Sequence, residues 1–151
     1  IGILEYLKEE ADIKIGDLGI NKTHIAANEN YNDFLSFNIK TDGKLTAKNE
    51  RTGKSLIVNG INEKVIRIVK TYNTTNQKES KIVVLSESGN IYGYYNEKFN
   101  NDISSITFTK IDTKIKMYGI DINSKKSYII GLDKESINYK IDYVKDKWKV
   151  K

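Results

Sequence analysis

Residues 81–95, KIVVLSESGNIYGYY, contain two apolar stretches separated by a short polar turn. The first stretch, IVVL, is followed by Ser88-Gly89, and the second carries Tyr92, Tyr94 and Tyr95. β-Branched and aromatic residues on either side of a Gly-containing turn are typical of a β-hairpin. These residues therefore predict a strand, a tight turn and a second strand, which sets the expected fold class for the whole chain.

Similar hairpin signals recur N-terminal to this stretch. Residues 34–49 predict a hairpin that turns at Asp42-Gly43. Residues 55–72 predict another hairpin, in which Asn59-Gly60 supplies the two positive-φ positions of a type I′ turn. Further strands are expected C-terminal to the opening stretch, over residues 103–109, 110–122, 126–132, 136–143 and at the end of 142–151.

The first residues of the chain have a different period. Residues 1–11 place Ile3, Leu4, Leu7 and Ala11 on one helical face, which predicts a short amphipathic helix. The chain as a whole, residues 1–151, is expected to be one mainly β, antiparallel domain of about nine or ten strands. It begins with Ile1 rather than Met, which is the pattern expected for a fragment of a longer protein.

A repeat of about 46 residues is visible in these strands. A shift of 46 residues lays KVIRIVKTY (64–72) over KIDTKIKMY (110–118). The same shift brings Leu45, Ile91 and Ile137 into register, each early in the second strand of an expected hairpin. Periods of this size with several strands per unit are typical of β repeat folds. Because Ile and Lys are common in this chain, chance matches are the alternative explanation.

The stretch IVVLSESGNIYGYY resembles the inner hairpin of bacterial β-propeller repeats of the regulator-of-chromosome-condensation type. The resemblance lies in the apolar strand, the acidic-Gly turn and the Ile-Tyr pair, and it extends loosely over two repeat units. The usual Trp-Gly after the second strand and His-Ser before the first are absent. The resemblance implies propeller-like blades, but three units are too few for a propeller of typically 4–8 blades. A three-fold trefoil-like fold and a sandwich therefore remain open.

Composition limits the classes of function. The chain has 38% hydrophobic and 30% charged residues, no Cys and a net charge of +5. No apolar run approaches the ~20 residues of a transmembrane helix, and without Cys there is neither a disulfide nor a thiolate metal site. Its 23 Lys, 23 Ile and 16 Asn have AT-rich codons, which indicates a low-GC bacterium. Only Arg51 and Arg67 are available for bidentate contacts, so specific nucleic-acid binding is not expected.

The tyrosine strand supplies the candidate ligand-binding residues. Tyr92 and Tyr94 point to one face of a strand, and exposed rings there would stack on sugars or bases. Tyr95, Asn90 and Asn96 lie beside them and complete the candidate site. The alternative is that the rings simply cover a half-buried face of the sheet, because tyrosine is a good strand residue.

Other motifs do not indicate a catalytic, cofactor or metal site. Gly53-Lys54-Ser55 is not a phosphate loop, because Lys48 stands where the motif requires its first Gly. Residues 121–135 begin like a calcium loop, but Lys126 occupies the position of the required Gly. His24 is the only histidine, and a capping or surface role is expected for it.

The sequence thus favours a non-enzymatic module with no cofactor, which binds or assembles with another protein. The alternative is a glycan or cell-envelope module that uses the surface tyrosines, with an anionic cell-wall polymer as a further possible ligand. An extracellular or cell-surface location in a Gram-positive bacterium is favoured over the cytoplasm. No residue pattern supports an enzyme.

Overall fold

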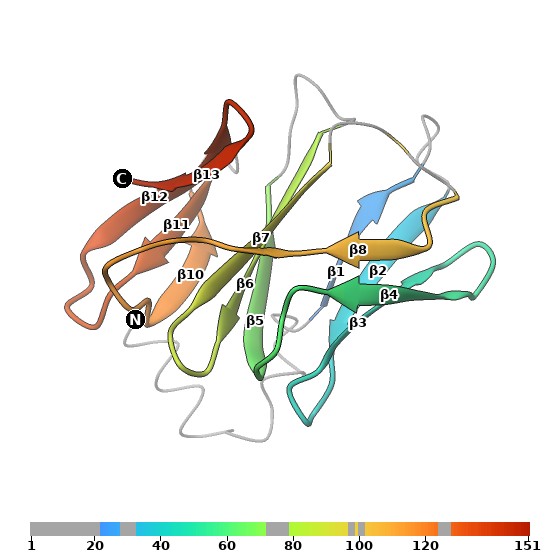
Figure 1. The fold of residues 1–151 in the computed structure, drawn as a ribbon, viewed down its shortest axis with the longest axis horizontal. Helices are drawn as coiled ribbons and strands as arrows, with labels where there is room; N and C mark the ends of the chain where they lie inside the picture. The colour runs from blue at the N-terminus through green and yellow to red at the C-terminus, as the bar shows by residue number, and fades with distance from the viewer. Residues whose placement is uncertain (1–21, 28–32, 72–78, 97–98, 100–101, 124–127) are drawn as a thin grey trace.

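The computed structural model describes residues 22–27, 33–71, 79–96, 99, 102–123 and 128–151. The described chain is mainly antiparallel β, as predicted, and contains no helix. The helix expected over residues 1–11 lies outside the described residues. The strands form three sheets, of which one lies between the other two (Figure 1).

The first sheet has the order β1-β2-β3-β4-β8, the second β5-β6-β7-β9 and the third β10-β11-β12-β13. β4 and β8 pair in parallel, whereas all other neighbouring strands are antiparallel. The bounds are β1 Lys22–Ala26, β2 Phe34–Ile39, β3 Leu45–Asn49, β4 Ser55–Asn59, β5 Val65–Lys70, β6 Ser80–Ser86, β7 Ile91–Asn96, β8 Ser105–Thr107, β9 Thr109–Lys110, β10 Gly119–Ile122, β11 Ile129–Leu132, β12 Asn138–Val144 and β13 Lys147–Val150.

Two of the predicted hairpins are confirmed. β6 and β7 pair from Ser80↔Asn96 to Leu85↔Ile91, and the Ser86 amide donates to the Asn90 carbonyl across the turn at 2.8 Å. β2 and β3 pair over their whole length around the Asp42-Gly43 turn. Both hairpins are local, because their turn residues and both strands lie within one short segment of sequence.

The hairpin predicted at Asn59-Gly60 is wrong. β4 pairs with β3 on one side and with β8 on the other, and β5 pairs with β6 in a different sheet. Gly60 does have a positive φ of 93°, but it turns the chain out of the first sheet and toward the second. The Asn59 carbonyl, free of a hairpin partner, accepts a hydrogen bond of 2.9 Å from the Phe108 amide.

The long strand predicted over residues 110–122 is also wrong in part. Residues 111–118 are not in a strand and cross from the second sheet to the third between β9 and β10. The Ile111 amide donates to the Ile91 carbonyl, and the Met117 amide donates to the Gly89 carbonyl. The side chains of Ile111 and Met117 are both buried. Their apolar spacing therefore reflects two separate contacts with the core rather than one face of a strand.

Two hydrophobic cores share the middle sheet. The first lies between the first and second sheets, and its largest fully buried side chains are Phe37, Leu35, Ile82 and Ile106. The second lies between the second and third sheets and includes Val83, Leu85, Ile120, Ile129 and Ile141. Alternate residues of β6 therefore face opposite cores, which explains the unbroken apolar run IVVL.

The sheets meet along their first strands. β1 contacts β5, and β5 contacts β10. This leaves one face of the first sheet turned away from the second sheet, and on it Lys22, His24, Lys48 and Ser55 are exposed.

Candidate functional site

The outward face of the first sheet is hollowed into a groove of about 810 Å³. Because side chains alternate along each strand, the outward positions of β1 to β4 line up in rows across the sheet. One row is Lys22, Asn38 and Thr46, and the next is His24, Ser36, Lys48 and Ser55. The complete lining is Lys22, Thr23, His24, Phe34, Ser36, Phe37, Asn38, Lys40, Thr46, Ala47, Lys48, Glu50 and Ser55.

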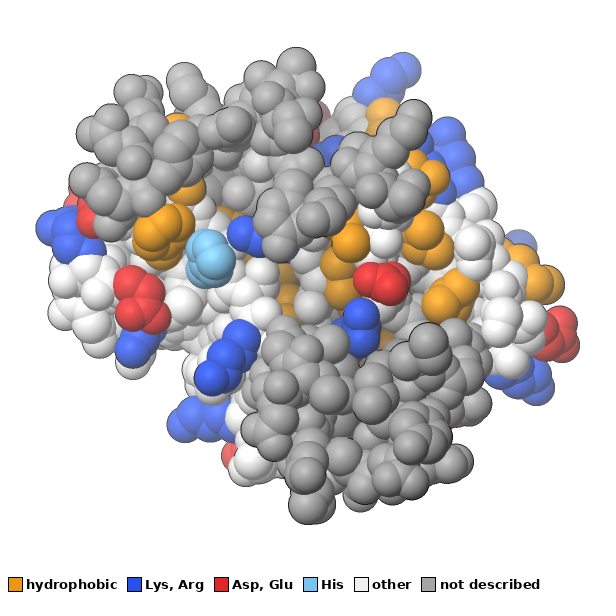
Figure 2. Space-filling view, turned by 180° about the vertical axis from the view of Figure 1, so that it is seen from behind, with side chains coloured by type: hydrophobic (Ala, Val, Ile, Leu, Met, Phe, Trp, Pro, Cys, Tyr) orange, Lys and Arg blue, Asp and Glu red, His pale blue; other side chains and the backbone are white. Residues whose placement is uncertain are grey.

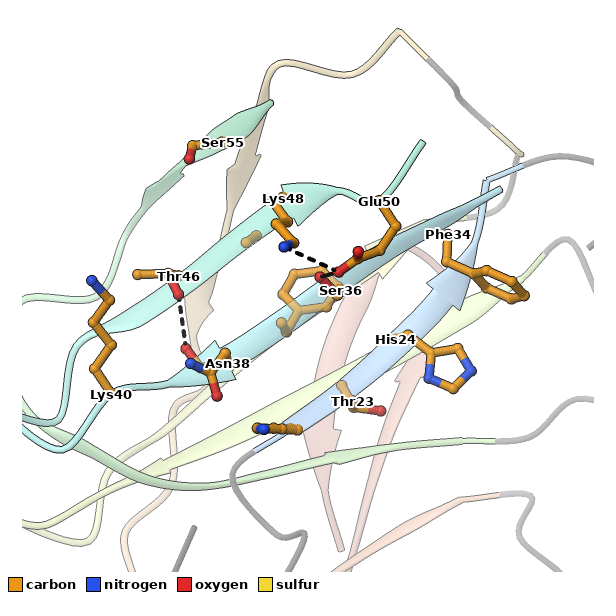
Figure 3. A pocket seen from close by; sticks show the side chains of 13 residues that line it. Thr23, His24, Phe34, Ser36, Asn38, Lys40, Thr46, Lys48, Glu50 and Ser55 are labelled. Atoms are coloured by element: carbon orange, nitrogen blue, oxygen red, sulfur yellow. Dashed lines mark hydrogen bonds and ion pairs between the residues drawn. The ribbon is translucent and has the colours of Figure 1, made fainter. Parts of the chain in front are cut away.

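An aromatic pair stands at one end of this groove. The rings of His24 and Phe34 meet edge to face, with centroids 5.1 Å apart and planes at 88°. Burial lowers the pKa of His24 from its usual 6.5, and nearby Lys70 lowers it further, so the imidazole is mainly neutral at pH 7. Figure 3 shows the two rings side by side, with Lys40 at the opposite end of the groove.

Polar groups fill the space between the two ends. Ser36 donates a hydrogen bond of 2.6 Å to Glu50, whose carboxylate also lies 3.8 Å from the Lys48 ammonium. The side-chain oxygen of Asn38 is buried and has no hydrogen-bond partner among the described residues. This face therefore carries hydroxyl and amide groups that both donate and accept hydrogen bonds.

The groove carries an excess of positive charge. Lys22, Lys40 and Lys48 line it against the single carboxylate of Glu50, which gives a formal charge of 3 − 1 = +2 with His24 neutral. Figure 2 shows the histidine, in pale blue, at the surface with basic, acidic and hydrophobic side chains around it. The arrangement is suited to holding an acidic, hydrophilic ligand.

The tyrosines predicted as a ligand platform lie elsewhere. The Tyr92 ring is 3% exposed and packs in the core between the first and second sheets. Tyr94 is half-buried against the same core, with its ring 5.8 Å from that of Phe108. The face shared by Tyr92 and Tyr94 is therefore an inner face, which supports the alternative that these rings serve packing.

Tyr95 points to the other side of the middle sheet. Its ring stacks on Tyr143 at 4.1 Å and 13°, and Tyr143 meets Trp148 edge to face at 5.3 Å. Asn96 is half-buried at the end of β7 and pairs with Ser80 across the hairpin. The structure thus separates Tyr95 from Tyr92 and Tyr94, and it does not gather the five predicted residues into one site.

Asn90 belongs to a hydrogen-bond network around Glu63. Its side-chain amide donates to the Glu63 carboxylate at 2.8 Å, and the Tyr92 hydroxyl donates to the same oxygen at 2.5 Å. Ser88 donates to the other carboxylate oxygen. Lys116, from the segment between β9 and β10, donates to the Asn90 side-chain oxygen at 2.6 Å. The network ties the β6–β7 turn to the crossovers on both sides of the middle sheet.

These donors set the charge of Glu63. Burial acts to raise the pKa of Glu63, but hydrogen bonds from Ser88, Tyr92, Asn90 and Ser86 outweigh it and lower the pKa to about 2. The pKa of Tyr92 rises to about 12, because burial, the hydrogen bond to Glu63 and its negative charge all disfavour the phenolate. Glu63 is therefore ionised, and Tyr92 protonated, throughout the neutral range.

Replacement of Glu63 by Gln is expected to lower the free energy of unfolding by about 1–2 kcal/mol at pH 7, as charge-assisted hydrogen bonds are lost. The folded-state pKa lies below the usual 4.5, so the carboxylate stabilises the fold above that value. This contribution is lost as the pH falls toward about 2. Urea unfolding at a series of pH values should show the two proteins converging in acid. Parallel profiles would contradict this, and Glu87→Gln, on the β6–β7 turn that donates to Glu63, is the matched control.

Neither a metal centre nor a membrane-spanning helix is found in the part of the chain that the structure describes. No group of three or more His, Asp or Glu side chains there could hold a metal ion. No helix there has the length and apolar character needed to cross a membrane. His24 lies exposed on β1.

The residues that line the groove were not identified as candidate site residues from the sequence. Their signal is the polar half of two alternating strands, with Ser36 and Asn38 in β2 and Thr46 and Lys48 in β3. No family model, curated protein or solved structure matches the chain. The geometry of the groove is therefore the basis for assigning a function.

Proposed function

We propose that the chain is a non-enzymatic binding module that holds an anionic ligand in the groove of the first sheet. The observation that carries this proposal is the groove itself, where three lysines face one carboxylate among hydroxyl and amide groups. Clefts lined by one sign of charge attract ligands of the opposite sign. The cell surface of a low-GC Gram-positive bacterium, with its anionic polymers, is the location that this proposal favours.

The floor of the groove supports binding without rearrangement. Phe37 and Ala47 lie beneath it and are 1% and 5% exposed, and both pack into the first core. β1, β2 and β3 are paired throughout the groove, so the rows of outward side chains are held at fixed spacing. A preorganised surface loses little conformational entropy when it binds.

The composition of the groove favours a hydrophilic ligand over a protein partner. The central parts of protein interfaces are depleted in lysine and enriched in large apolar side chains. Here Phe37 and Ala47 are buried beneath the groove. Phe34 is the large apolar side chain that reaches the surface of the groove. The groove therefore suits an envelope polymer better than a protein partner, and the first sheet takes the place of the tyrosine strand as the binding surface.

We further propose that the first and second sheets are copies of one unit. β2 and β6 begin at residues 34 and 80, and β3 and β7 at 45 and 91, so both pairs are 46 residues apart. In both sheets consecutive antiparallel strands are followed by a later strand at the edge, β8 in the first sheet and β9 in the second. Repeats of this kind present open outer faces at the ends of the array, and the groove lies on one of them.

The proposal predicts a specific loss of anion binding when the groove lysines are neutralised. Inorganic polyphosphate should bind the chain, and the double variant Lys22→Gln/Lys48→Gln should bind roughly tenfold more weakly in low salt. Each exposed charge pair contributes up to about 1 kcal/mol, and about 1.4 kcal/mol corresponds to tenfold. Isothermal titration calorimetry at low and high salt measures both effects.

The matched control removes the same charge from another sheet. Lys147 and Lys149 are exposed on β13, at the edge of the third sheet. Lys147→Gln/Lys149→Gln should bind polyphosphate as the unmodified chain does, apart from a small effect of net charge. Equal weakening by both double variants would show that overall charge, rather than the groove, attracts the anion.

A further inference from the structure

We infer that the anionic ligand of the groove is a polysaccharide, whose sugar rings pack against Phe34 and His24 while its acidic groups meet Lys22 and Lys48. This inference rests on the proposed function and names the ligand class of the same site. It follows from three features of the groove, which are the aromatic pair, the hydroxyl groups and the extent of the sheet.

The aromatic pair offers a surface that a simple polyanion does not need. Phe34 is half-buried and His24 is exposed, so the pair is held by the sheet yet reaches the groove. The apolar faces of sugar rings pack on flat aromatic surfaces, whereas bare phosphate groups have no apolar face. A ligand that combines rings with charge would use both ends of the groove.

The hydroxyl groups of the groove suit a ligand that both donates and accepts hydrogen bonds. Ser36, Thr46 and Ser55 line the groove, and Glu50, which already accepts from Ser36, has further lone pairs as an acceptor-only carboxylate. Polyphosphate offers only acceptors at neutral pH and can donate to none of these oxygens. Sugar hydroxyls donate and accept, and thus match the three hydroxyls and the remaining lone pairs of Glu50.

The shape of the groove favours an extended chain over a single small sugar. Its lining comes from four adjacent strands, β1 to β4. Neighbouring strands lie about 4.8 Å apart, so the lining spans roughly 14 Å across the sheet. The aromatic pair and Lys40 lie at opposite ends of the groove, as Figure 3 shows. A polymer can reach both ends at once.

The test compares four soluble polymers on the 151-residue chain by calorimetry in low salt. Dextran sulfate has rings and charge, polyphosphate has charge only, dextran has rings only, and poly-glutamate represents an acidic protein. Dextran sulfate should bind about tenfold more tightly than polyphosphate at equal charge concentration, and dextran should bind weakest. Phe34→Leu should weaken dextran sulfate binding about fivefold and leave polyphosphate binding unchanged.

A second variant tests the aromatic pair without removing a side chain that packs in the core. His24→Gln changes an exposed side chain, and it should weaken dextran sulfate binding in the same selective way. Equal affinity for dextran sulfate and polyphosphate, with no effect of either variant, would overturn the polysaccharide while leaving the anion-binding function intact. Tightest binding of poly-glutamate would identify an acidic protein as the ligand instead. If no polyanion binds, the proposed function itself fails, and the polysaccharide fails with it.

Discussion

Replacement of Gly60 by alanine is expected to destabilise the fold by about 3 kcal/mol or more. Gly60 has a φ of 93°, a conformation that costs an L-residue about 1–2 kcal/mol. An added Cβ would also stand 1.9 Å from the Phe108 carbonyl oxygen, so the backbone itself must move. Such overpacking typically costs about 1–3 kcal/mol. The movement would strain the hydrogen bond from the Phe108 amide to Asn59.

Gly53 supplies the matched control for this substitution. It has a similar φ of 71°, but an added Cβ there meets nothing within 4 Å. Gly53→Ala should therefore show the conformational cost alone, about 1 kcal/mol. Urea denaturation of the two variants separates the steric contribution from the conformational one. Equal losses at both positions would show that the chain does not pass Phe108 as closely as described.

Replacement of Tyr92 by alanine is expected to cost about 4 kcal/mol, because it removes a ring that is 3% exposed in the first core. Tyr92→Phe keeps the ring and removes only the hydrogen bond to Glu63, so it should cost about 1 kcal/mol. Tyr118 is 41% exposed, and Tyr118→Ala should cost markedly less than Tyr92→Ala. Thermal or urea unfolding measures all three.

The same variants distinguish packing from ligand binding. Tyr92 faces the core between the first two sheets, whereas the groove lies on the opposite face of the first sheet. Tyr92→Phe should therefore bind polyphosphate as tightly as the unmodified chain. Weakened polyphosphate binding by Tyr92→Phe, under conditions in which the variant is folded, would return Tyr92 to the list of ligand contacts.

The sequence was sufficient for the fold class and for the hairpins around residues 42–43 and 86–90. In both hairpins the turn and its two strands are adjacent, so local preferences decide the outcome. Asn59-Gly60 carries an equally strong local signal, yet its strand pairs in parallel with β8, far along the chain. Only Gly60 of this pair has a positive φ, so the type I′ turn predicted there does not form. An Asn-Gly pair favours a turn of the chain but does not determine which strand the chain will then meet.

The candidate site was harder to predict for a related reason. Alternation placed Tyr92 and Tyr94 on one face, but it could not indicate that both faces of the middle sheet are buried. The groove depends on β1 lying beside β2 and on β4 lying beside β3. His24 lies beside Ser36 only once β1 has paired with β2, and Ser55 lies beside Lys48 only once β4 has paired with β3. Their common surface is therefore a product of the tertiary structure.

The shared middle sheet also governs how the protein opens. β6 supplies Ile82 and Val84 to one core and Val83 and Leu85 to the other. Detachment of either outer sheet would therefore expose a complete apolar face of the middle sheet to water. Local opening is costly under these conditions, so we expect the three sheets to unfold together. The groove is thus held in shape by residues of the middle sheet, which pack against the opposite face of the first sheet.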